Sequence, residues 1–236
     1  SALTINDGFA AWIPEAIRGD DPARSAAATF SRLLAERGVA VEGEPAAGMA
    51  PQGAVEIAGI DSAPLRDVAA EALRESDNTT AELLLKLVGR YVQLAPSTAG
   101  GAAVVEAHLG ALGLPLAGTD VVDGSGLDRG NRVTCDLMVG LLDRVGPDSV
   151  LASGLAVAGE TGTLIRRFQG TPVQGVLRAK SGSINGVLTL AGMVDLADGS
   201  TVSFAVLQNG PGVDRRGHAV WENLLAAILG VPSWKA

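Results

Sequence analysis

The sequence predicts an α/β protein of the α+β kind, in which an antiparallel sheet is flanked by helices. Apolar residues recur at helical spacing in several segments between residues 22 and 142. Two apolar runs, residues 187–196 and 201–207, are separated by Asp198-Gly199, which is a strong hairpin signal. Both runs are apolar on both faces, which indicates a sheet covered by helices on each side.

The N-terminal quarter predicts one helix between less regular segments. Ala2-Leu3-Thr4-Ile5 alternates like a strand. Asp21-Pro22 opens the helix, because Asp caps a helix well and Pro suits its first position. Gly38 closes it as a left-handed cap. A loop over residues 39–51 and a short strand at Val55-Glu56-Ile57-Ala58 are expected next.

Two helices then meet at Ser76-Asp77-Asn78. The first starts at Ser62-Ala63-Pro64, and its expected buried face is Leu65, Val68, Ala69, Ala72 and Leu73. The second, capped by Asn78 or Thr79, is apolar nearly all round, so we expect it in the middle of a domain. Ser76 and Asn78 are therefore either fixed functional groups or simple caps.

The C-terminal half predicts further helices and the sheet. Helices are expected over residues 100–112, from Thr134 through Leu142, and over residues 215–229, with a loop over residues 120–132. Cys135 is interpreted as a small packed residue, His108 as a surface residue of its helix, and Arg166 and Arg167 as surface charges. We expect residues 1–236 to form a single unit, since this length suits one large domain.

Composition excludes several kinds of partner and cofactor. The net charge is −8 and no basic stripe is present, which argues against nucleic acid. One cysteine excludes an internal disulfide, and one cysteine with two histidines argues against a zinc site; no metal or other cofactor is expected. No apolar run has the length of a membrane helix. The start at Ser1, without methionine or a signal peptide, suggests a cut within a longer polypeptide.

The candidate site centres on Ala179-Lys180-Ser181-Gly182-Ser183. Lys180 is one of only three lysines, and it lies on a predicted strand. A cation followed by two hydroxyls and a glycine can hold a carboxylate or move a proton near a serine. The alternative is an edge-strand lysine that discourages pairing between sheets.

Other enzyme motifs fail on spacing. Gly124, Gly126 and Gly130 miss the dinucleotide pattern by one residue, and no lysine follows a phosphate-loop glycine. Ser125 and Ser181 lack the glycines of a nucleophile elbow. Neither histidine lies near a serine motif, so a Ser-His-Asp triad has little support.

Ser76-Asp77-Asn78 and Lys180-Ser181-Gly182 correspond to two of the three motifs of penicillin-binding enzymes. With them, the sequence resembles the C-terminal part of D-alanyl-D-alanine carboxypeptidases of the penicillin-binding protein 4 type. The ordered matches include Ser62-Ala63-Pro64-Leu65, Ala81-Glu82, Asp123-Gly124-Ser125-Gly126-Leu127 and Gly162-Thr163-Leu164. The resemblance implies a β-lactamase/transpeptidase-like fold, here lacking its N-terminal portion, and an extracytoplasmic location in the periplasm or cell-wall space.

The resemblance also implies a serine-type hydrolase of peptidoglycan stem peptides that end in D-Ala-D-Ala. It would act through an acyl-enzyme as a carboxypeptidase, with endopeptidase activity as a second expectation. β-Lactam antibiotics would be covalent inhibitors. Ser76 would relay protons to the leaving nitrogen, Asn78 would bind the substrate amide, and Lys180 would supply positive charge. Ser181 and Ser183 would bind the terminal carboxylate, and Gly182 would let the substrate backbone approach. Many family members carry Thr in place of Ser181 and Ser183, but the hydroxyl is kept.

The third motif, Ser-x-x-Lys, is absent. Leu83, Leu177 and Pro232 lie three residues before the three lysines. We therefore expect the nucleophile to come from the N-terminal remainder of the same polypeptide, and this segment to be inactive by itself. Two alternatives stay open: a non-catalytic relative that binds cell-wall peptides, and a globular domain whose serines only cap helices.

Overall fold

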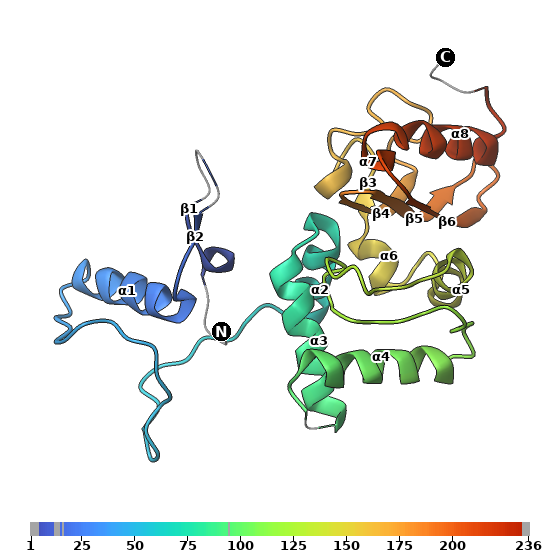
Figure 1. The fold of residues 1–236 in the computed structure, drawn as a ribbon. Helices are drawn as coiled ribbons and strands as arrows, with labels where there is room; N and C mark the ends of the chain where they lie inside the picture. Colours follow the sequence, from blue (N-terminus) through green and yellow to red (C-terminus); the bar gives the residue numbers. More distant parts are fainter. Residues whose placement is uncertain (1–4, 12–14, 16, 94, 233–236) are drawn as a thin grey trace. The chain divides into compact units, whose positions relative to one another are not determined.

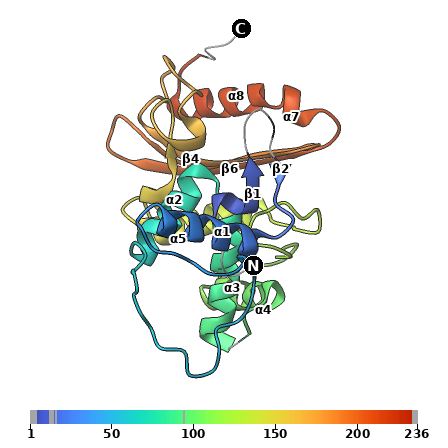
Figure 2. The ribbon, with the colours of Figure 1, turned by 90° about the vertical axis from the view of Figure 1, so that its left-hand side faces the viewer.

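A computed structural model describes residues 5–11, 15, 17–93 and 95–232 of the chain (Figures 1 and 2). The chain divides into two compact units, Ser1–Asp61 and Ser62–Ala236, and each is described by itself. The strand predicted at Ala2-Leu3-Thr4-Ile5 lies almost wholly outside the described residues.

The first unit is built around one helix. Its elements are the 3-10 turn η1 (Asn6–Gly8), the strands β1 (Phe9–Ala11) and β2 (Ile17–Arg18), and the helix α1 (Pro22–Ala35). The Asp21 side chain accepts a hydrogen bond from the amide of Arg24 at 3.0 Å, and Gly38 has a φ of 81°. Both predicted ends of this helix are confirmed.

The strand predicted at Val55-Glu56-Ile57-Ala58 is wrong. These residues have no regular structure, and the Val55 and Ile57 side chains are 84% and 100% exposed. A strand needs a neighbouring strand to bond its backbone, and none runs beside this segment in the described part of the chain. The alternation of apolar residues in this segment was therefore not enough to form a strand.

The second unit combines helices with one sheet (Figure 1). Its helices are α2 (Leu65–Glu75), α3 (Asn78–Gln93), α4 (Thr98–Ala111), α5 (Cys135–Val145), α6 (Val150–Gly154), α7 (Val213–Arg216) and α8 (His218–Leu229), with the 3-10 turn η2 (Gly162–Leu164). The strands β3 (Ala156–Val157), β4 (Leu177–Ile184), β5 (Val187–Asp195) and β6 (Thr201–Asn209) are antiparallel in the order β3-β4-β5-β6.

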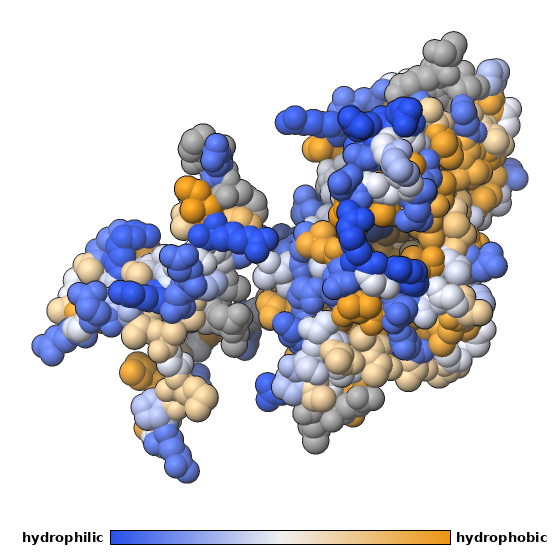
Figure 3. Space-filling view, in the orientation of Figure 1, coloured by the Kyte–Doolittle hydropathy of each residue, from blue (hydrophilic) through white to orange (hydrophobic). Residues whose placement is uncertain are grey.

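Helices cover both faces of this sheet, as its doubly apolar strands predicted. In Figures 1 and 2, α8 lies over one face, and α2, α5 and α6 lie on the other side. Trp221 and Leu225 of α8 pack with Leu177 and Leu190 in one buried cluster. A second cluster on the other side joins Leu142 of α5, Ala152 of α6 and Leu155, which follows α6, to Ala191 and Met193 of the sheet. In the view of Figure 3, apolar side chains gather on the side of this unit where β6 lies in Figure 1.

Several local predictions for the second unit are wrong. Leu83 and Leu87 of α3 are 42% and 45% exposed, because α3 packs mainly against α4 and α2 and leaves one flank open within this unit. Leu65 is likewise 58% exposed, since it starts α2. Cys135 is exposed because it occupies the first position of α5, after the confirmed cap Thr134. The predicted last helix is broken at Gly217 into α7 and α8.

Candidate active site

Lys180 reaches across the sequence to Ser76. In the β4–β5 ladder Lys180 is paired with Ala191, and directly paired residues present their side chains on the same face. That face is the one covered by α5 and α6. The Lys180 ammonium donates to Ser76 Oγ at 2.6 Å and to the Ser181 carbonyl oxygen at 2.7 Å. The half-buried side chain of Lys180 therefore points toward the interior of the unit. This disagrees with the alternative that Lys180 only discourages pairing between sheets.

Burial lowers the pKa of the Lys180 ammonium below its usual value of 10.5. Its two partners are neutral oxygens, and in the described part of the chain no carboxylate lies within ion-pair distance of it. No nearby negative charge therefore offsets the desolvation free energy of the Lys180 ammonium. A lysine in this state releases a proton more readily than a surface lysine, which suits proton transfer with Ser76.

Ser76 lies in the short connection between α2 and α3. It ends α2 in the left-handed conformation, with a φ of 60° and a ψ of 45°, which costs a residue other than glycine about 1–3 kcal/mol. The cap of α3 is Asp77, whose side chain accepts from the Thr80 amide at 3.1 Å and the Thr80 hydroxyl at 2.6 Å. The prediction that Asn78 or Thr79 caps this helix is therefore wrong. Because Asp77 does the capping, the Ser76 hydroxyl is available to Lys180.

The remaining predicted site residues lie within three positions of Ser76 or Lys180 in the sequence, but only some of their side chains form hydrogen bonds with other described residues. The Ser181 hydroxyl donates to Thr163 Oγ1 at 3.1 Å. A Cβ atom at Gly182 would lie 2.5 Å from Thr189 Oγ1 on β5, so packing within the sheet also favours glycine here. Asn78 and Ser183 are exposed, and their side chains form no hydrogen bond with the described residues. Lys180, Ser76 and Ser181 are thus joined, whereas Asn78 and Ser183 remain open to solvent.

A loop that follows α4 packs against the start of α3. The Glu82 carboxylate accepts from the Gly124 amide at 3.1 Å, the Ser125 amide at 3.0 Å and the Ser125 hydroxyl at 2.7 Å. A Cβ atom at Gly124 would lie 2.5 Å from the Ala81 carbonyl oxygen. Neither Glu82 nor Thr163 was singled out from the sequence, although both belong to stretches that carry the resemblance. Their partners are too distant in the sequence for spacing to reveal them.

Residues 8–228 match the model of the D-Ala-D-Ala carboxypeptidase 3 (S13) family. The chain belongs to the S13 family. It is 37% identical over 202 residues to a D-alanyl-D-alanine carboxypeptidase of Actinomadura sp. (strain R39). This alignment covers 81% of this chain and 37% of that protein. It is 30% identical over 191 residues to the D-alanyl-D-alanine carboxypeptidase DacB of Haemophilus influenzae, covering 78% of this chain and 40% of that protein.

The solved structures agree with this assignment to the S13 family. Penicillin binding protein 4 of H. influenzae matches with a TM-score of 0.72 and 29% identity, over 85% of this chain and 46% of that one. The predicted resemblance and the predicted fold class are confirmed. The chain spans less than half the length of the relatives named here.

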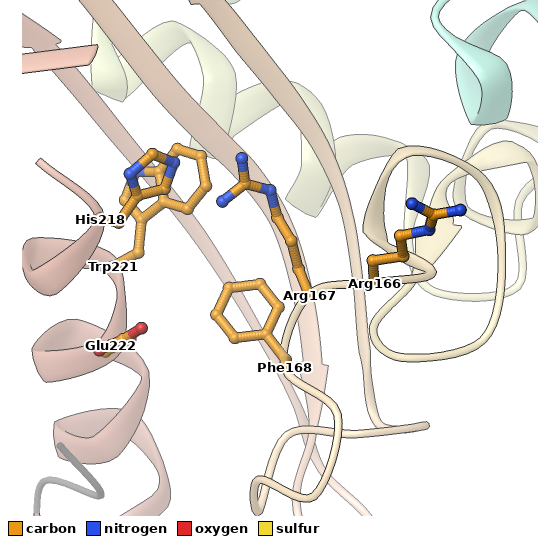
Figure 4. Close-up of a pocket in the computed structure, with 6 residues that line it drawn as sticks. All are labelled: Arg166, Arg167, Phe168, His218, Trp221 and Glu222. Atoms are coloured by element: carbon orange, nitrogen blue, oxygen red, sulfur yellow. The ribbon is translucent and has the colours of Figure 1, made fainter. Parts of the chain in front are cut away.

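A cavity of about 350 Å³ lies in the second unit of this S13 chain, and Lys180 is not among the residues that line it. Figure 4 shows the lining residues. The cavity is lined by Arg166, Arg167 and Phe168 and by three residues of α8, namely His218, Trp221 and Glu222. The α8 helix covers the face of the sheet opposite to that of Lys180. Arg166 and Arg167 are exposed as predicted, and the Arg167 guanidinium also lies 5.7 Å from the centre of the Trp221 ring. This cavity does not include the candidate catalytic residues.

Acid should loosen the loop of this S13 chain that contains Asp123. Burial raises the pKa of the Asp123 carboxyl, but hydrogen bonds from the Asp128 amide, the Asn131 side chain and the Gly126 amide outweigh it and hold the pKa below 3.8. The ionised form therefore stabilises the loop above about pH 4, and that contribution is lost as the pH falls through the lowered pKa. NMR shifts of the Gly126 and Asp128 amide protons, titrated from about pH 6 to about pH 2, should move together with a midpoint below 3.8.

The matched control is Asp198→Asn, in an exposed turn where Ser200 binds the carboxylate. It should leave the titration of the Gly126 amide unchanged, whereas Asp123→Asn should abolish it. A midpoint above 3.8 in the unaltered protein would contradict the assignment.

Proposed function

We propose that this chain is the substrate-orienting part of a serine-type D-Ala-D-Ala carboxypeptidase, which cleaves peptidoglycan stem peptides through an acyl-enzyme. The observation that carries the proposal is the 2.6 Å hydrogen bond from Lys180 Nζ to Ser76 Oγ, which joins two motifs 104 residues apart. Proton transfer to a leaving group needs this contact between an acid and a hydroxyl. Membership of the S13 family supports the same reaction.

Ser76 and Lys180 would protonate the leaving nitrogen. In this step the Ser76 hydroxyl gives its proton to the amine of the departing D-alanine, and Lys180 Nζ returns a proton to Ser76 Oγ along the existing hydrogen bond. Burial lowers the pKa of Lys180 and makes that return easier. The ammonium also favours negative charge nearby, and this would assist the serine nucleophile.

The strand β4 would bind the substrate along its edge. Within the described sheet, β3 pairs only with Arg178 and Ala179, so residues 180–184 have β5 alone as a neighbour. An extended peptide can add to such an edge through main-chain hydrogen bonds. Ser181 and Ser183 would donate to its terminal carboxylate, Gly182 would leave room for its backbone, and the exposed Asn78 would bind its acyl-side amide.

The nucleophile, in our proposal, comes from the N-terminal remainder of the same polypeptide. None of the three lysines follows a serine at the Ser-x-x-Lys spacing.

We also propose that both units belong to one penicillin-binding domain, and that the protein works outside the cytoplasm, where peptidoglycan lies. No helix in the described ranges is long and apolar enough to cross a membrane. β-Lactams would acylate the same serine, and the H. influenzae relative has been crystallised with one.

Covalent labelling with a fluorescent penicillin tests the proposal. The full-length polypeptide should give a labelled band that excess unlabelled penicillin suppresses, and it should release D-alanine from a D-Ala-D-Ala peptide. A folded full-length protein that takes up no label would contradict the proposal. If that protein binds the peptide reversibly, it is instead a non-catalytic binder of cell-wall peptides. Release of peptide fragments from cross-linked stem peptides would add endopeptidase activity.

A further inference from the structure

The Ser181 hydroxyl has a fixed partner in Thr163. Ser181 Oγ donates to Thr163 Oγ1 at 3.1 Å, and both side chains are half-buried. A serine hydroxyl can otherwise occupy three staggered positions and rotate its proton freely. Thr163 is β-branched, so its own side chain is stiff and can hold the partner in one position.

The turn that carries Thr163 is firmly anchored. Leu164, the next residue, is completely buried in the cluster beneath α8. The Gly159 amide donates to the Leu164 carbonyl oxygen at 3.0 Å, and the Val157 amide donates to Thr161 Oγ1 at 2.9 Å. The turn η2 therefore cannot shift without opening the core.

The same turn presses against the end of α2 that leads to Ser76. Gly162 has a φ of 54°, and a Cβ atom there would lie 2.2 Å from the Arg74 carbonyl oxygen. Arg74 lies two residues before Ser76. The turn η2 thus contacts one candidate site residue through Thr163 and lies beside the backbone that leads to another.

We propose that Thr163 is a positioning residue that orients the Ser181 hydroxyl toward the terminal carboxylate of the substrate. This inference rests on the proposed function. When Ser181 turns its proton to the carboxylate, the Thr163 hydroxyl can donate to Ser181 Oγ in exchange. The two hydroxyls then form a chain in which each hydrogen bond polarises the next. Thr163 acts only through Ser181 and touches no reacting atom.

Two variants of the full-length protein separate this role from a purely structural one. Thr163→Val keeps the shape but removes the hydroxyl, and Thr163→Ser keeps the hydroxyl. A typical hydrogen bond contributes about 0.5–1.5 kcal/mol, so Thr163→Val should raise the KM for a D-Ala-D-Ala peptide about threefold to tenfold. Its kcat should change less than about twofold, because the interaction forms equally in the bound substrate and the transition state. Thr163→Ser should behave like the unaltered protein.

The control substrate is the same peptide with its terminal carboxylate amidated. It should react or bind more weakly in all forms, and Thr163→Val should make no further difference to it. Thr171→Val is the matched control variant, because it removes a hydrogen bond of 2.7 Å to the Phe168 carbonyl oxygen in a loop of the same unit. That variant should leave KM unchanged.

Equilibrium binding of both peptides keeps the two proposals distinct, since binding does not need the nucleophile. If the unaltered protein binds the peptide but never cleaves it, the proposed carboxypeptidase function fails, and the ratio of Kd values still decides the role of Thr163. An unchanged KM and Kd in Thr163→Val would overturn the positioning role. An equal loss for the acid and the amide would also overturn it.

Discussion

Replacing Lys180 with methionine in the full-length protein is expected to slow acylation by penicillin about 10²-fold to 10⁴-fold, the range found for removal of a general acid or base. Methionine resembles lysine in length but cannot donate a proton to Ser76 or attract the substrate carboxylate. The hydrogen bonds from Lys180 Nζ to Ser76 Oγ and to the Ser181 carbonyl oxygen both disappear. The rate constant of labelling by fluorescent penicillin measures the loss.

The Lys180→Met protein should still fold, and its stability relative to the unaltered protein should depend on pH. Because burial lowers the pKa of Lys180, the folded state disfavours the charged form, and this penalty is present at neutral pH. The penalty fades as the pH rises through the lowered pKa toward the unfolded value of 10.5. The stability of the unaltered protein relative to Lys180→Met should therefore increase with pH, as measured by urea unfolding.

Lys86→Met is the matched control, since Lys86 lies on α3 and forms no ion pair with the described residues. It should be acylated within about twofold of the normal rate. Normal acylation of a folded Lys180→Met protein would refute the proposed role of this lysine. Loss of labelling in both variants would point to general damage instead.

Replacing Trp221 with alanine should lower the free energy of unfolding of the second unit by about 3–5 kcal/mol, the usual cost of removing a buried Trp or Phe side chain. Trp221 is 2% exposed and belongs to the cluster between α8 and the sheet. Its ring also meets that of His218 edge to face, with centroids 4.9 Å apart, and the Arg167 guanidinium lies over it. Alanine would leave a cavity that these neighbours cannot fill.

Urea unfolding followed by circular dichroism measures this cost. Val220→Ala is the control, because the neighbouring Val220 is 46% exposed and should lose less than about 0.5 kcal/mol. Trp221 lies on the face of the sheet opposite to that of Lys180, so the part of the Trp221→Ala protein that remains folded should be acylated normally. A loss below about 1 kcal/mol would show that α8 is not held by this side chain.

Several predictions that rest on neighbouring residues were confirmed, although α3 is capped by Asp77 and not by the expected Asn78 or Thr79. Asp21 and Thr134 cap their helices, Gly38 is left-handed, and Asp198-Gly199 joins β5 to β6. In each case the signal and its structural effect lie within a few residues, where steric preferences and local hydrogen bonds decide. The prediction of a strand at Val55-Glu56-Ile57-Ala58 failed because strand pairing is a long-range interaction.

The sequence by itself determined that this protein has an antiparallel sheet covered by helices on both faces, and that it carries two of the three motifs of penicillin-binding enzymes. Only the tertiary structure decided that Ser76 is the partner of Lys180. It alone placed Thr163 against Ser181 and Glu82 against the loop of Ser125. The physical reason is distance along the chain, since only packing of the helices against the sheet brings such side chains within hydrogen-bonding reach.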